Sequence, residues 1–120
     1  MIYREETSCV QSTPRAERIA LLNDALRKTG VGGRIVVTSG VQVLPDFDAA
    51  ALLQSLASYD AFDADNDPHG ERDFGDVSFG DADLLWKIDY YDPTLTWGSE
   101  DPADPTITTR VLTIMLSEEY

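Results

Sequence analysis

Three aspartates spaced two residues apart, Asp63, Asp65 and Asp67, are the first group whose residue types and spacing could perform chemistry. Carboxylate oxygens on a flexible loop are ligands that Ca²⁺ and other hard cations prefer. The EF-hand pattern is not met, because Pro68 and Phe74 stand where its glycine and its bidentate glutamate would lie. The loop is therefore a metal-site hypothesis with a divalent cation as the cofactor. The alternative is a solvated loop whose aspartates accept hydrogen bonds from backbone amides.

A second group surrounds the one histidine of the chain. His69 is followed by Glu71 and Asp73, and such a trio could supply a general base or a metal ligand. With the aspartate loop it defines one functional hypothesis, a metal-binding or hydrolytic enzyme using the segment Asp63 to Asp73. The alternative is a turn histidine that bonds its neighbours. The sequence favours a protein that is not an enzyme, since it has no evident activated nucleophile and no CxxC or HExxH motif.

The strongest signal is charge. The chain of 120 residues has a formal net charge of −13, and residues 60–104 hold fourteen acids against Arg72 and Lys87. Such a field repels nucleic acid and anionic membranes and attracts basic protein surfaces. We expect a non-catalytic binding protein that presents this segment to a basic partner, in its sharpest form as a DNA mimic. The alternative is an acidic surface that serves solubility alone. The expected partner-binding residues are Asp81, Asp83, Asp89, Tyr91, Asp92 and Trp97.

The apolar pattern predicts the elements that position these groups. Helical spacing predicts helices from Thr13 to about Gly30 and from Asp46 to about Tyr59. The run Arg34 to Thr38 predicts a strand buried on both faces. A long loop over 60–75, a hairpin of strands over 72–79 and 83–91, a short strand at 95–97, a connector over 99–105 and a strand over 106–116 follow. A helix is the competing interpretation of the last segment.

This order predicts an α+β fold, with two N-terminal helices packed on one face of a mainly antiparallel sheet of about four strands. Residues 1–12 are expected to be a flexible lead-in, and residues 13–120 a single domain. A lone cysteine, Cys9, and the lack of a signal-peptide pattern predict a cytoplasmic protein. No apolar run is long enough to span a membrane. The expected core consists of Leu22, Leu26, Val36, Leu52, Leu56, Val77, Trp86, Ile88, Leu112 and Ile114.

Four stretches carry a resemblance. They are IALLNDALRKTGVGGRIVVTSGV (19–41), DNDPHGERDFG (65–75), WKIDYYD (86–92) and DPADPTITTRVLTIMLSEEY (101–120). With these motifs the chain, from about residue 15 to its end, resembles a family of small acidic proteins of unknown function found in proteobacterial genomes and plasmids. The resemblance implies a single small domain in a bacterial cytoplasm, and it implies no activity.

Overall fold

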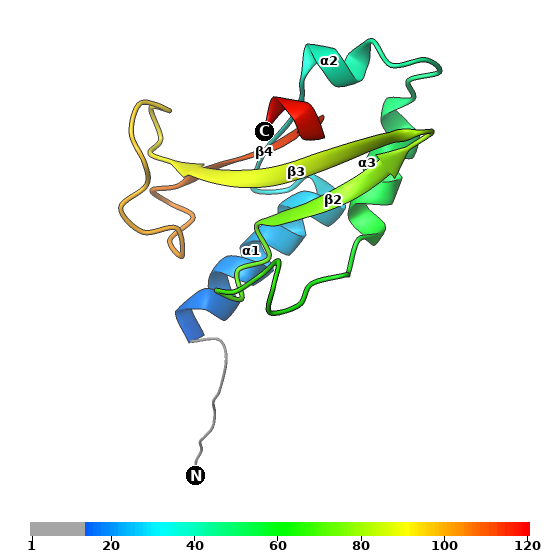
Figure 1. Ribbon diagram of the computed structural model, residues 1–120. Coiled ribbons are helices and arrows are strands. Elements are labelled where there is room, and N and C mark those ends of the chain that lie inside the picture. Colours follow the sequence, from blue (N-terminus) through cyan, green and yellow to red (C-terminus); the bar gives the residue numbers. More distant parts are fainter. Residues whose placement is uncertain (1–13) are drawn as a thin grey trace.

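The computed structural model describes residues 14–120, so the predictions for the lead-in 1–12, for Cys9 and for a cap at Thr13 lie outside the described residues (Figure 1). The elements are α1 (Pro14–Thr29), β1 (Gly33–Val37), α2 (Ser39–Gln42), α3 (Ala49–Ser58), β2 (Phe74–Phe79), β3 (Ala82–Tyr91), β4 (Thr109–Leu116) and the 3-10 helix η2 (Ser117–Glu119). None of the helices in the described range is both long and apolar enough to cross a membrane.

The four strands form one sheet in the order β1-β4-β3-β2. The β2–β3 hairpin and the β3–β4 pair are antiparallel, while β1 runs parallel to β4. Gly80 closes the hairpin with a φ of +59°, a backbone conformation that favours glycine. The predicted α+β class with a mostly antiparallel four-stranded sheet is confirmed. The predicted pair of helices is joined by a third, α2, which the sequence did not indicate.

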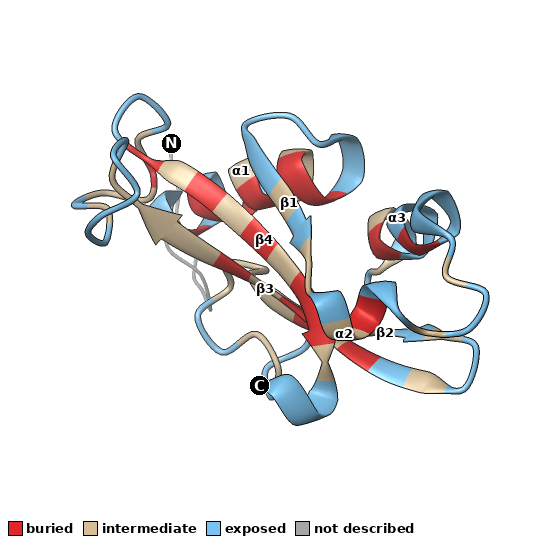
Figure 2. Cartoon of the chain, turned by 90° about the horizontal axis from the view of Figure 1, so that it is seen from above, coloured by how far each residue is buried: buried red, intermediate tan, exposed pale blue. Residues whose placement is uncertain are grey.

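Buried and less buried side chains alternate along β3, and the buried ones identify the side of the sheet that faces the core. Leu84, Trp86 and Ile88 are buried, and Leu112 and Ile114 of β4 lie beside them in the register (Figure 2). Leu26 of α1 and Leu52 and Leu56 of α3 belong to the same hydrophobic cluster. The sequence predicted most of this core, because period-two and helical spacing each identify a buried face.

Two parts of the predicted core and strand pattern are wrong. Among the described residues the β1 strand pairs only with β4, so it is an edge strand of this sheet, and Val36 is 41% exposed on the side of the sheet away from the cluster. A short β-branched run does not by itself distinguish an edge strand from a buried central strand. Leu22 and Val77 are half-buried rather than fully buried.

The remaining corrections concern element ends. The second predicted helix begins at Ala49, not Asp46, because the Asp48 side chain caps it by accepting a hydrogen bond from the Ala51 amide. Asp46 has a φ of +59° and lies in the preceding turn. Residues 95–97 form a turn instead of a strand, and the last strand begins at Thr109, not at residue 106.

Replacing Gly75 of β2 by alanine should destabilise the fold. A Cβ at this buried position would lie 2.7 Å from Nε1 of Trp86, whose ring is fully buried. Overpacking of this kind costs roughly 1–3 kcal/mol. Urea unfolding followed by tryptophan fluorescence measures the loss. Ser78→Ala, at an exposed position of the same strand, is the control and should change stability by less than about 0.5 kcal/mol. Equal stability of the two variants would contradict the packing argument.

Candidate functional site

The outward side of β3 carries a row of polar and aromatic residues opposite the core. Asp83, Asp89 and Tyr91 point to this side, because they alternate with the buried residues of the strand. Asp76 of β2 is paired with Leu85 and faces the same way. The structure therefore brings three of the predicted partner-binding residues onto one face of the sheet. We call the group Asp76, Asp83, Asp89 and Tyr91 the outer β3 face.

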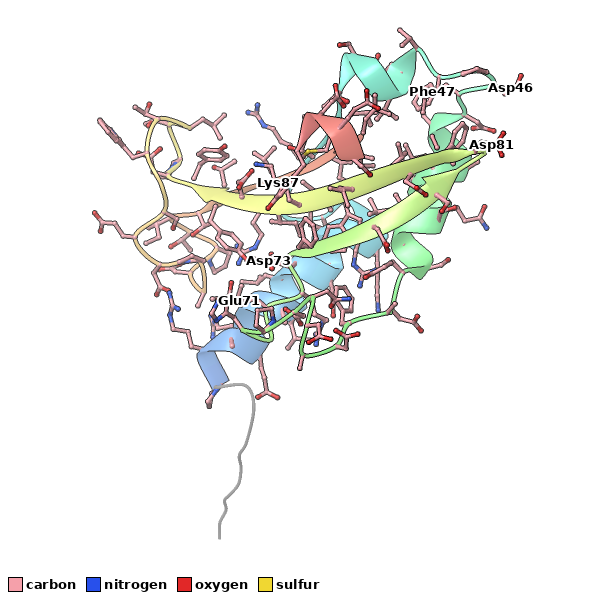
Figure 3. The ribbon with its side chains drawn as sticks, viewed as in Figure 1. Asp46, Phe47, Glu71, Asp73, Asp81 and Lys87 are labelled. Atoms are coloured by element: carbon pink, nitrogen blue, oxygen red, sulfur yellow. The ribbon has the colours of Figure 1, made fainter. Side chains whose placement is uncertain are left out.

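The other predicted partner-binding residues lie at the two ends of the same strand. Asp81 is exposed in the hairpin turn before β3 (Figure 3), and Asp92 and Trp97 follow the strand's last residue. A strand of ten residues separates the two ends by roughly 30 Å. The predicted set thus extends along a whole strand and does not converge on one point.

The basic side chains leave this acidity largely uncompensated. Lys87 pairs with Asp89 at 2.9 Å on the outer β3 face. Arg72 instead reaches Asp24 of α1, with Nη2 2.7 Å from Oδ2. Arg27 and Arg110 are almost completely buried, at 3% and 1% exposure. Within residues 14–120, the acids of segment 60–104 therefore meet few cations at the surface.

The loop predicted to bind a metal is organised by its own aspartates. Oδ1 of Asp63 accepts hydrogen bonds from the amides of Asp65 and Asn66, at 2.9 and 3.0 Å. Oδ1 of Asp67 accepts from the Arg72 amide at 3.0 Å. These are the bonds that short polar side chains make in turns. They give the side chains of Asp63 and Asp67 a structural role that needs no cation.

The predicted metal ligands and catalytic residues do not converge. Among the side chains of residues 14–120, no three from histidine, cysteine, aspartate and glutamate are grouped so as to hold a metal ion. His69 is exposed in the loop, whereas Glu71 and Asp73 are half-buried and turn toward the α1 side of the sheet (Figure 3). Of the three residues, His69 therefore lies in solvent, whereas Glu71 and Asp73 lie in a polar cluster.

That polar cluster is the feature the sequence did not reveal. The fully buried Asn23 of α1 donates hydrogen bonds to Oη of Tyr90 at 2.9 Å and to the carbonyl of Glu71 at 3.0 Å. Tyr90 Oη donates to Oε1 of Glu71 at 3.1 Å. Nε of Arg110 donates to Oδ1 of Asn23 at 2.8 Å, and its Nη2 donates to the carbonyl of Pro102. The one sign of it in the sequence is that Asn23 and Arg110 are polar residues within otherwise apolar helix and strand patterns.

The environment of this cluster shifts the protonation of its members. Burial, followed by the charge of Glu71, raises the pKa of the Asp73 carboxyl above its ordinary value. Burial also raises the pKa of Tyr90, so its phenol stays protonated and can donate to Glu71. Burial lowers the pKa of Arg110, which retains its charge because an arginine starts far above neutral pH. The cluster has donors and acceptors in matched pairs, which is the arrangement of a structural network.

Comparison with known proteins places the chain in a family. Residues 37–119 match the family model described as "Protein of unknown function (DUF3768)". Because the match covers more than half of the chain, the protein belongs to this family, and the resemblance to a family of unknown function is confirmed. No curated protein matches the chain. No solved structure matches it either.

Replacing Asn23 by alanine should cost roughly 2–4 kcal/mol of unfolding free energy, because a buried guanidinium and a buried phenol each lose a partner. Chemical denaturation measures the loss. Asn66→Ala removes an amide that bonds only within the 60–75 loop and should cost less than about 1 kcal/mol. A comparable loss in both variants would contradict a special role for the Asn23 network.

Asp73→Asn should stabilise the protein at neutral pH. A carboxyl whose folded pKa is raised favours folding below its unfolded pKa, and this contribution is lost as the pH rises through the folded value. The charged form is thus disfavoured at pH 7, and an amide removes that penalty. The advantage over the native protein should shrink as the pH falls toward the ordinary aspartate range. Thermal melts across this pH range measure the difference, and Asp65→Asn, an exposed change of equal charge, is the control.

Proposed function

We propose that this protein is a non-catalytic binding protein whose segment 60–104 engages a basic surface of another protein. The observation that supports this most is uncompensated charge. Of the fourteen carboxylates in the segment, only Asp89 and Asp101 form ion pairs with described residues, to Lys87 and Arg15. The twelve others form no ion pair with a described residue, and those that are exposed are free to interact with a partner's cations. A surface of one sign speeds association with the opposite sign and disfavours wrong partners.

The placement of the acids on the sheet gives the proposal its geometry. The outer β3 face has carboxylates along its length, and Asp81 and Asp92 continue the row at the two ends. The helix α1 lies on the opposite side of the sheet (Figure 1). A basic partner could therefore lie along β3 without meeting α1, and it would meet η2, whose Ser117 hydroxyl donates to the Asp83 carbonyl.

The sharpest form of the proposal is mimicry of DNA. A row of carboxylates about 30 Å long would occupy the place of backbone phosphates in the cleft of a DNA-binding protein. Duplex DNA itself is an unfavourable ligand, because its phosphates repel this surface. A cytoplasmic location is part of the same proposal.

The test is displacement of a short labelled DNA duplex from histones, which serve as the basic probe. We expect the native protein to release the duplex at low ionic strength and to release less at physiological salt, where charges are screened beyond about 8 Å. Asp81→Asn with Asp83→Asn should weaken competition roughly two- to thirtyfold, since each exposed ion pair contributes about 0.2–1 kcal/mol.

A charge-matched control separates a binding face from net charge alone. Glu17→Gln with Asp48→Asn removes the same two charges outside the segment, and asparagine replaces aspartate well as a helix cap. This control should compete almost as well as the native protein. If both double variants lose the same affinity, the acidity acts only through the total charge and the proposal is wrong. Absence of competition at low salt would also contradict it.

A further inference from the structure

One residue of the acidic segment combines exposure with a large aromatic surface. Trp97 is 73% exposed, whereas Trp86, the other tryptophan, is fully buried. It lies in the connector between β3 and β4, which projects from the body of the protein (Figure 1). Exposed tryptophans are enriched among the residues that dominate binding energy at interfaces.

Hydrogen bonds hold the backbone on both sides of this tryptophan in place. The Asp92 amide donates to the Trp97 carbonyl at 2.8 Å, and Oδ1 of Asp92 accepts from the Thr96 amide at 3.0 Å. Gly98 bridges back to Tyr91, and the Ser99 amide donates to the Tyr90 carbonyl at 3.0 Å. A ring on a fixed loop loses little conformational entropy when a ligand packs on it.

A hollow of about 300 Å³ lies beside the ring. Its lining consists of Asp92, Pro93, Trp97, Gly98, Glu100 and Ile107. The apolar part, from Pro93, Ile107 and the indole, suits the methylene stem of a long side chain. The carboxylates of Asp92 and Glu100 give the same hollow two negative charges. Hydrogen bonds to Asp92, the Thr96 amide first, lower its pKa and keep it ionised at neutral pH.

This combination is complementary to one kind of side chain. A guanidinium is flat and weakly hydrated, stacks on the face of an indole and donates two parallel hydrogen bonds to a carboxylate. An ammonium group is compact and strongly hydrated, so it uses the ring face less well. An uncharged apolar residue would leave the negative charges of both carboxylates without a counter-charge.

We infer that the hollow beside Trp97 binds an arginine side chain of the basic partner, stacked on the indole and held by Asp92 and Glu100. The inference rests on the proposed function and goes beyond it, because it names the anchoring contact and the residue type that the partner supplies. It adds Pro93, Glu100 and Ile107 to the partner-binding residues expected from the sequence.

The experiment titrates the protein with a short oligo-arginine peptide at low ionic strength. Calorimetry gives the affinity, and ¹H–¹⁵N spectra follow the two indole N–H signals, assigned with Trp97→Phe. We expect the Trp97 signal to shift and the Trp86 signal, from a buried ring, to remain in place. Trp97→Ala and Trp97→Leu should both weaken binding roughly three- to tenfold, because leucine keeps apolar area but lacks the ring face. Glu100→Gln should weaken it about two- to fivefold.

Control variants and a second peptide separate the possible outcomes. Val43→Ala removes an exposed apolar side chain outside the hollow and should leave the affinity unchanged. If oligo-arginine binds the native protein and the Trp97 variants equally, the arginine site is wrong while the acidic binding surface stands. If oligo-lysine shifts the Trp97 signal with equal affinity, the selectivity for arginine is wrong. If neither peptide binds at low salt, the proposed function itself is contradicted.

Discussion

The buried guanidinium of Arg110 is the constraint on which much of this structure depends. It belongs to β4, yet it donates to Asn23 of α1 and to the Pro102 carbonyl in the connector, and it lies 5.3 Å over the ring of Tyr90. A buried charge must find dipoles or an opposite charge, because its hydration is lost. Here neutral carbonyl oxygens and an aromatic face supply them. One side chain thereby fixes α1, β3, β4 and the connector relative to one another.

The burial of arginine side chains also shapes the electrostatic field at the protein surface. Arg27 is also buried, where its Nη1 donates to the carbonyls of Leu56 and Tyr59 at the end of α3, at 3.1 and 2.8 Å. Cations that complete the interior cannot screen carboxylates at the surface. The negative surface therefore follows partly from where the arginines are used and not only from the number of acids. This links the stability of the core to the charge that a partner meets.

Local sequence patterns predicted most helices and strands and their buried faces. The strand order and the polar cluster depend on contacts between residues that are distant in the sequence. The alternation of β3 predicted which residues reach the core and hence which acids share the outer face. The edge position of β1 depends on the order of strands, which an apolar run does not encode. The Asn23–Arg110 bond joins residues 87 positions apart, and no spacing rule reaches that far. The candidate metal loop failed to converge because backbone amides engage its Asp63 and Asp67 side chains first.

Aspartates on strands are stronger evidence for a binding surface than aspartates in loops. Asp92 and Asp104 cap turns by accepting backbone hydrogen bonds, so folding alone accounts for their presence. Asp76 and Asp83 lie on strands, where aspartate is disfavoured, and their side chains receive no hydrogen bond or ion pair from residues 14–120. Solubility would be served equally well by acids placed in loops. Strand acids that oppose local preference and support no fold contact are therefore the stronger evidence that the outer β3 face binds a partner.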